Sequence, residues 1–215
     1  MEDLVIIKYN AGNIQSVLYA LERIGVNALV TDDYEKIQSA KKVIFPGVGE
    51  ASSAMRYLKD HKLDVLIKDL KQPVFGICLG MQLMCAYSEE NDTTCLGIFD
   101  EHVKKFIPPT GGDKGGAVGG AFPTEEKPGG FKVPQIGWNN IFNLKTDLYK
   151  DLPENSFCYF VHGYYAALGE HTIATADYIQ PYSASLHKAN FYGAQFHPEK
   201  SAKAGEQILK NFLSL

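Results

Sequence analysis

Val74-Phe75-Gly76-Ile77-Cys78-Leu79-Gly80 is the stretch that decides the fold of this chain. An apolar run ends at a cysteine with a glycine two residues away on either side, and a helical pattern follows. We expect a buried strand to turn sharply into a helix here, with Cys78 in a strained conformation and the glycines relieving the crowding. The turn would present the sulfur at the carboxyl edge of the sheet, where open α/β sheets bind ligands. The alternative is a buried structural cysteine, a common position for a free thiol.

Short apolar runs alternate with helical spacing through the first half of the chain, and strand patterns dominate the second. This order predicts an α/β fold with a mostly parallel central sheet flanked by helices, and a more antiparallel second half. We expect strands at 4–7, 28–30, 43–45, 74–77, 103–107, 140–142, 157–161, 172–176 and 191–196, and helices at 13–24, 51–59, 63–70, 79–87 and 202–213.

We expect residues 1–215 to form one domain. Residues 108–130 contain much Gly and Pro and few large apolar side chains. Because such a segment buries too little surface to offset the entropy of ordering it, we interpret it as a mobile surface loop.

The composition excludes several classes of protein. A net charge of −4 and scattered Lys and Arg residues argue against nucleic acid as a partner. From the sequence we expect neither a signal peptide nor a segment long enough to cross a bilayer. The four cysteines lack CxxC or zinc-ligand spacing, so we expect free thiols, no metal and a cytoplasmic location. Four histidines are expected at the surface: His61, His102, His171 and His187.

A second motif, Gln195-Phe196-His197-Pro198-Glu199, follows the last expected strand. Residues two apart in an extended stretch point to the same side, so Glu199 can hold one nitrogen of His197 and turn the other toward a thiol. This arrangement suits a general base that activates a nucleophile. Alone, the motif could equally be a surface histidine beside a helix-capping glutamate.

A third motif, Phe45-Pro46-Gly47-Val48-Gly49, also lies at a strand end. Backbone N–H groups of Gly47 and Gly49, together with that of Leu79, could stabilise an oxyanion during acyl transfer. A plain glycine turn is the alternative. His162 ends an apolar strand and could line the same site, but we do not expect it to act as a base.

These motifs together resemble the class I, triad-type glutamine amidotransferases, which have a flavodoxin-like fold. Among them, they resemble the glutaminase subunits of imidazole glycerol phosphate synthase. The resemblance runs nearly end to end, and the segments that carry it are Tyr9 to Asn13 with Ser16-Val17, Pro46 to Gly49, Gly76 to Gln82, Val133-Pro134, Gly137 to Asn139, Phe160 to His162 with Tyr164, and Gln195 to Ser201.

The resemblance implies that Cys78 attacks the carboxamide of L-glutamine, with His197 as general base and Glu199 orienting it. It places Gln82 and Glu90 at the amino-acid end of the substrate. It implies no cofactor, and a heterodimer with a (β/α)₈-barrel cyclase that receives the ammonia through a channel for histidine biosynthesis. His162, Gly163 and Tyr164 are expected near the glutamine.

Three features depart from the pattern of the family. Gln135 stands where many relatives have histidine, Gly163 replaces a frequent serine, and the segment at 108–130 is longer than usual. The alternatives are an amidotransferase subunit of anthranilate or GMP synthesis, a stand-alone γ-glutamyl hydrolase, and a non-catalytic interaction module. An intact set of Cys78, His197 and Glu199 argues against the last.

Overall fold

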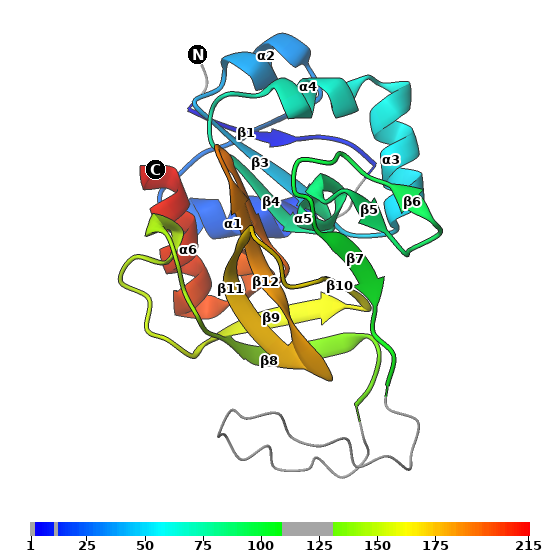
Figure 1. Ribbon diagram of the computed structural model, residues 1–215. Coiled ribbons are helices and arrows are strands. Elements are labelled where there is room, and N and C mark those ends of the chain that lie inside the picture. The colour runs from blue at the N-terminus through cyan, green and yellow to red at the C-terminus, as the bar shows by residue number, and fades with distance from the viewer. Residues whose placement is uncertain (1–2, 11–12, 109–130) are drawn as a thin grey trace.

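The computed structural model describes residues 3–10, 13–108 and 131–215. The loop expected at 108–130 therefore lies, beyond its first residue, outside the described residues. Within these ranges the centre is an 11-stranded sheet in the order β2-β1-β3-β4-β13-β12-β10-β7-β5-β6, with β11 paired to β12 beside this path (Figure 1).

Five neighbouring strands of this sheet are parallel to one another. They are β1 (Leu4–Ile7), β2 (Leu29–Thr31), β3 (Lys42–Gly47), β4 (Val74–Cys78) and β13 (Phe191–Ala194). Every residue of β1 and β4 is buried, as a sheet covered on both faces requires, whereas β2 at the edge is only partly buried.

The other strands of the large sheet are mainly antiparallel. They are β5 (Tyr87–Ser88), β6 (Thr93–Thr94), β7 (His102–Lys105), β10 (Tyr164–Ala166), β11 (Thr172–Tyr178) and β12 (Gln180–Lys188). A separate antiparallel ribbon consists of β8 (Gln135–Ile141) and β9 (Ser156–His162). The predicted α/β class with its antiparallel second half is confirmed.

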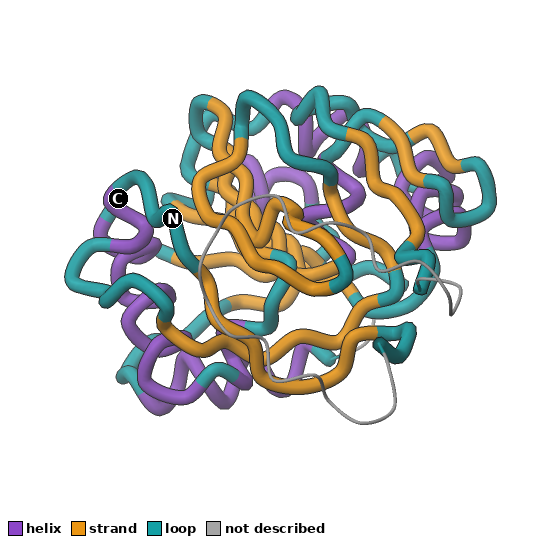
Figure 2. The backbone as a smooth tube through the Cα atoms, turned by 60° about the horizontal axis from the view of Figure 1, so that its bottom comes forward, coloured by secondary structure: helices purple, strands orange, loops and turns teal. Residues whose placement is uncertain are grey.

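Helices cover both faces of the parallel strands, and Figure 2 shows the strands at the centre with helices outside them. Alternate residues of β1 face opposite ways: Leu4 and Ile6 pack with α1 (Ile14–Arg23) and α6 (Ala202–Ser214), whereas Val5 and Ile7 pack with the other helices. Those are α2 (Tyr34–Ser39), α3 (Ala51–Asp60), α4 (Leu63–Asp69) and α5 (Leu79–Met84). No helix in the described part of the chain is long and apolar enough to span a membrane.

Several boundaries differ from the sequence-based expectation. The helix expected at 79–87 is α5 (Leu79–Met84) and ends earlier, because Leu96, Ile98 and Phe99 donate backbone hydrogen bonds to carbonyls of its last turn. Five of the α-helices and strands were not predicted: the short elements α2, β5, β6 and β10, and the nine-residue strand β12. Strand β12 was not predicted because Ser183 and Ser185 make its sequence look polar. Both serines are nevertheless fully buried, and their hydroxyl groups are hydrogen-bonded.

One histidine expected at the surface is buried. His171 is 9% exposed and its Nε2 lies 3.1 Å from Oδ2 of Asp100. Because Asp100 lies 71 positions away in the sequence, the residues next to His171 gave no sign of this contact, and the surface position expected for His171 was wrong.

Candidate active site

Cys78 occupies the sharp turn between β4 and α5. Its φ of 53° and ψ of −108° confirm the predicted strained conformation. A Cβ at Gly80 would lie 1.9 Å from the carbonyl oxygen of Phe45, and one at Gly76 would lie 2.9 Å from the backbone nitrogen of Met81. Both glycines are therefore required by close backbone approach, as the pattern around the cysteine predicted.

His197 and Glu199 follow β13 in the turn that leads to α6. Nδ1 of His197 lies 2.8 Å from Oε1 of Glu199, and both side chains are almost completely buried. The same carboxylate oxygen accepts a hydrogen bond of 3.1 Å from Nδ2 of Asn13. The pairing of His197 with Glu199, which was predicted from their two-residue spacing, is present.

Strand pairing brings His197 to Cys78 although 119 positions separate them. Strand β13 lies parallel beside β4 with Ala194 opposite Ile77, so both strands end at the same edge of the sheet. Burial by itself lowers the pKa of His197, but hydrogen bonds and charges of Cys78 and Glu199 outweigh it and raise the pKa to about 10. The site therefore favours an imidazolium held between a sulfur and a carboxylate.

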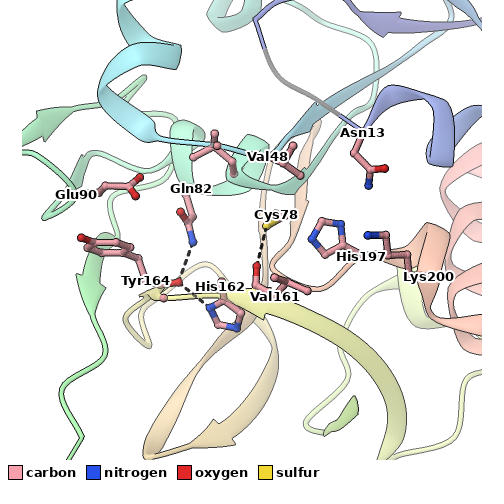
Figure 3. Close-up of a pocket in the computed structure, with 13 residues that line it drawn as sticks. Asn13, Val48, Cys78, Gln82, Glu90, Val161, His162, Tyr164, His197 and Lys200 are labelled. Atoms are coloured by element: carbon pink, nitrogen blue, oxygen red, sulfur yellow. Dashed lines mark hydrogen bonds between the residues drawn. The ribbon is translucent and has the colours of Figure 1, made fainter. Parts of the chain in front are cut away.

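A cavity of about 360 Å³ opens over the sulfur (Figure 3). Its walls include every predicted site residue except Gly47 and Glu199. Glu199 contacts His197 from outside the cavity. A Cβ at Gly47 would lie 2.6 Å from Oη of Tyr9, so packing explains this glycine. The lining residues are Asn13, Val48, Gly49, Cys78, Leu79, Gln82, Glu90, Val161, His162, Gly163, Tyr164, His197 and Lys200.

Two polar side chains, Gln82 and Glu90, line the cavity away from the triad. Oε2 of Glu90 accepts a 2.7 Å hydrogen bond from the backbone N–H of Ala51 at the start of α3. Half-burial raises the pKa of Glu90, an effect that this hydrogen bond opposes. Nε2 of Gln82 donates to the carbonyl oxygen of Tyr164 at 2.9 Å, as Figure 3 shows.

His162 is held neutral. Burial lowers its pKa to about 4. Its Nδ1 lies 2.7 Å from the carbonyl oxygen of Tyr164, and its Nε2 lies 3.3 Å from Oη of Tyr182. The same hydroxyl lies 3.0 Å from Oε1 of Gln135, a buried residue at the start of β8. Since both ring nitrogens are engaged, the geometry agrees with the expectation that His162 is not the base.

Sequence reasoning assigned no role to several groups around the sulfur. The carbonyl oxygen of Val161 lies 3.8 Å from Sγ of Cys78, and Nε2 of Gln195 lies 3.7 Å from the same atom. Gln195 stands two positions before His197, so the alternation argument that paired His197 with Glu199 could have found it. The carbonyl of Val161 could not have been found in this way, because every residue has a backbone carbonyl whatever its side chain.

Comparison with known proteins agrees with this geometry. The sequence matches the family "Glutamine amidotransferase class-I" over residues 5–215. Imidazole glycerol phosphate synthase subunits HisH of Bacteroides fragilis and Bacteroides thetaiotaomicron are 55% and 53% identical over 212 residues, covering 99% of this chain and 99% of each relative.

Solved structures show the same fold at low sequence identity. A glutamine amidotransferase matches with a TM-score of 0.68 and 14% identity, covering 99% of this chain and 97% of its own. PurLQS from Thermotoga maritima matches with a TM-score of 0.64 and 14% identity, covering 100% of this chain and 99% of the matched chain. By its full-length family match and its similarity to curated relatives, this chain belongs to the class I glutamine amidotransferases and, within them, to the HisH subunits of imidazole glycerol phosphate synthase.

Proposed function

We propose that this chain hydrolyses L-glutamine at Cys78 and passes the ammonia to the cyclase subunit of imidazole glycerol phosphate synthase. The observation that carries the proposal is that Cys78 and His197, from segments far apart in the sequence, line one cavity, while Glu199 holds His197 from behind it. The synthase is inferred from the names of the relatives. The hydrolysis of glutamine is inferred from the residues of the site.

In the first step His197 takes the thiol proton of Cys78 and becomes an imidazolium, the sulfur attacks the carboxamide carbon of glutamine, and the carbonyl oxygen becomes an oxyanion. The backbone N–H groups of Gly49 and Leu79, which both line the cavity, are the donors that we assign to it. The imidazolium of His197 then gives its proton to the leaving nitrogen, ammonia departs, and a γ-glutamyl thioester remains on Cys78.

In the second step water replaces ammonia. His197, now neutral, takes a proton from water as the oxygen attacks the thioester carbon, and the bond to sulfur breaks to release glutamate. Glu199 stays ionised and holds His197 in one orientation throughout, because its carboxylate accepts from Nδ1.

Gln82 and Glu90 are proposed to hold the amino-acid end of the substrate. Both of their side chains line the cavity on the same side of Cys78 in Figure 3. Nε2 of Gln82 is occupied by protein acceptors, so its Oε1 is the atom that can accept from a substrate ammonium group. Glu90 supplies a carboxylate for the same charge.

The β8–β9 ribbon is the face that we assign to the cyclase. Its register places Ile136 opposite Val161, Trp138 opposite Tyr159 and Asn140 opposite Phe157, so these six side chains share one face. Ile136, Trp138 and Phe157 are 64%, 52% and 60% exposed. An exposed apolar face of this kind marks an interaction surface, and Val161 joins it to the cavity.

Two further features of the chain support the proposal. One sheet extends from β2 to β6 through both halves of the sequence, which supports a single domain. All four cysteines are free thiols, which supports residence in the reducing cytoplasm.

The test is to mix the purified chain with a candidate cyclase subunit, separate the complex by size-exclusion chromatography and measure glutamate release. We expect slow release by the chain alone and a strong increase with the cyclase and its nucleotide substrate, because ungated hydrolysis would waste ammonia. Full activity of the isolated chain, unchanged by the cyclase, would identify a stand-alone hydrolase instead.

A further inference from the structure

Gln195 is a fully buried amide that the steps above do not use. It is the last residue before the Phe196–Glu199 turn, and its side chain is 0% exposed. Its Oε1 accepts a 2.8 Å hydrogen bond from Nε2 of Gln82, and its Nε2 lies 3.7 Å from Sγ of Cys78. A buried amide next to a nucleophile affects that nucleophile according to which of its two ends faces the sulfur.

The surrounding hydrogen bonds determine that orientation. A backbone carbonyl can only accept, so the carbonyl oxygen of Tyr164 must face the NH₂ group of Gln82, at 2.9 Å. The second proton of that NH₂ group points at Gln195, which must therefore present its oxygen to Gln82. The NH₂ group of Gln195 is then the end that faces Cys78. The carbonyl oxygen of Tyr164, which can only accept, thus fixes the orientation of both glutamine side chains.

The two uncharged polar groups at the sulfur have opposite effects. The carbonyl oxygen of Val161, at 3.8 Å, accepts from a thiol and repels a thiolate. The NH₂ group of Gln195, at 3.7 Å, donates and therefore favours the thiolate. Gln195 thus balances the carbonyl that would otherwise hold the proton on sulfur.

We propose that Gln195 is a thiolate-stabilising residue: its side-chain N–H, oriented by Gln82 and the Tyr164 carbonyl, donates to Sγ of Cys78 and keeps the nucleophile reactive before glutamine binds. The inference rests on the proposed function in one respect, that Cys78 is the nucleophile. No bond is made or broken by Gln195, and the proton of Cys78 still passes to His197.

The substitution that removes the donor to sulfur without adding charge is Gln195→Leu, and it is the deciding variant. Gln195→Glu is the second variant: its carboxylate still accepts from Nε2 of Gln82, but it replaces the donor with an oxygen whose negative charge also repels the thiolate. The measurement is the rate of Cys78 alkylation by iodoacetamide between pH 5 and 9, without glutamine or cyclase, with the modified cysteine identified by mass spectrometry.

We expect both variants to react about tenfold more slowly at pH 6.5, with the midpoint of the pH profile moved upward by about one pH unit. At the alkaline end of the range their rates should approach that of the unmodified protein. There the thiol of Cys78 ionises even without a hydrogen-bond donor. A residue that merely packs would lower the rate equally at every pH, or leave it unchanged.

The matched control is Gln72→Glu. Nε2 of Gln72 donates a 2.8 Å hydrogen bond to the carbonyl oxygen of Ile37, far from the cavity, so the same substitution removes one amide donor elsewhere. Urea denaturation of all variants establishes that they are folded. An unmoved pH profile in folded Gln195→Leu overturns the inference, whereas a Cys78→Ala variant that still used glutamine would overturn the proposed function itself.

Discussion

The carboxylate of Glu199 uses only one of its two oxygens. Oε1 lies 2.8 Å from Nδ1 of His197 and 3.1 Å from Nδ2 of Asn13, whereas Oε2 is buried and has no hydrogen-bond partner among the described residues. A glutamine at this position can keep its oxygen toward His197 and place its NH₂ group where Oε2 stands. Glu199→Gln therefore removes the charge while it preserves the shape.

We expect Glu199→Gln to lower kcat for glutamine hydrolysis in the cyclase complex by roughly a hundredfold or more, because the imidazolium of His197 loses its negative partner. Steady-state glutamate release measures the effect. The control is Glu206→Gln, which removes a carboxylate from an exposed ion pair with Lys210 on α6. Equal rates in the two variants would show that Glu199 has no electrostatic role.

Cys78→Ala should abolish synthesis that depends on glutamine and leave synthesis from added ammonium salts intact in the cyclase complex. The sulfur is the only atom that the substitution removes, and the cavity residues around it keep their positions. Product formation from each nitrogen source is measured side by side. Loss of both activities would indicate that the variant disturbs the partner.

Stability should depend on pH through His162. Its pKa is about 4 in the folded chain and near 6.5 in an unfolded one, so below pH 6.5 the unfolded state takes up a proton that the folded state refuses. The free energy of unfolding should fall as the pH drops from 6.5 toward 4, by about 3 kcal/mol over the full window.

Urea denaturation at pH 7.5 and pH 5 tests this dependence. His162→Gln should show a smaller loss of stability between the two values than the unmodified chain, whatever its absolute stability. His102→Gln, at an exposed ring on β7, should keep the full loss. An identical pH response in all three proteins would refute the assignment.

Gly80→Ala should destabilise the chain by roughly 3 kcal/mol or more, because the new Cβ would fall 1.9 Å from a backbone oxygen of Phe45 that cannot move freely. Gly163→Ala is the matched control. A Cβ there meets Val133 and Pro134 side chains at 3.7 and 3.9 Å, which is ordinary contact. Thermal unfolding should show a large shift for the first variant and little for the second.

Trp138→Asp should weaken binding of the cyclase by about tenfold or more, because it places a charge in the apolar face of the β8–β9 ribbon. Isothermal titration with the cyclase measures the affinity. Val65→Asp substitutes another exposed apolar residue, 53% exposed on α4, and should bind normally. Equal losses in both variants would mean that the ribbon is not the docking face.

Much of the fold was predictable because its local signals and its tertiary environment agree. Strand β1 and helix α4 are apolar or amphipathic where they are buried, and the turn at Cys78 has the glycines that its close backbone contacts demand. Prediction failed where the environment overrides the local pattern. Ser183 and Ser185 are buried in β12 only because carbonyls of Ala167 and Gly193 accept from them.

The sequence by itself determined the class of fold, the elbow at Cys78 and the pairing of His197 with Glu199, because each depends on residues close together along the chain. Only the tertiary structure decided that His197 meets Cys78, that Gly47 is explained by packing and that the NH₂ group of Gln195 faces the sulfur. These contacts depend on how strands distant in the sequence pair and on which hydrogen-bonding groups come together in the folded chain. Neither can be read from one short stretch of sequence.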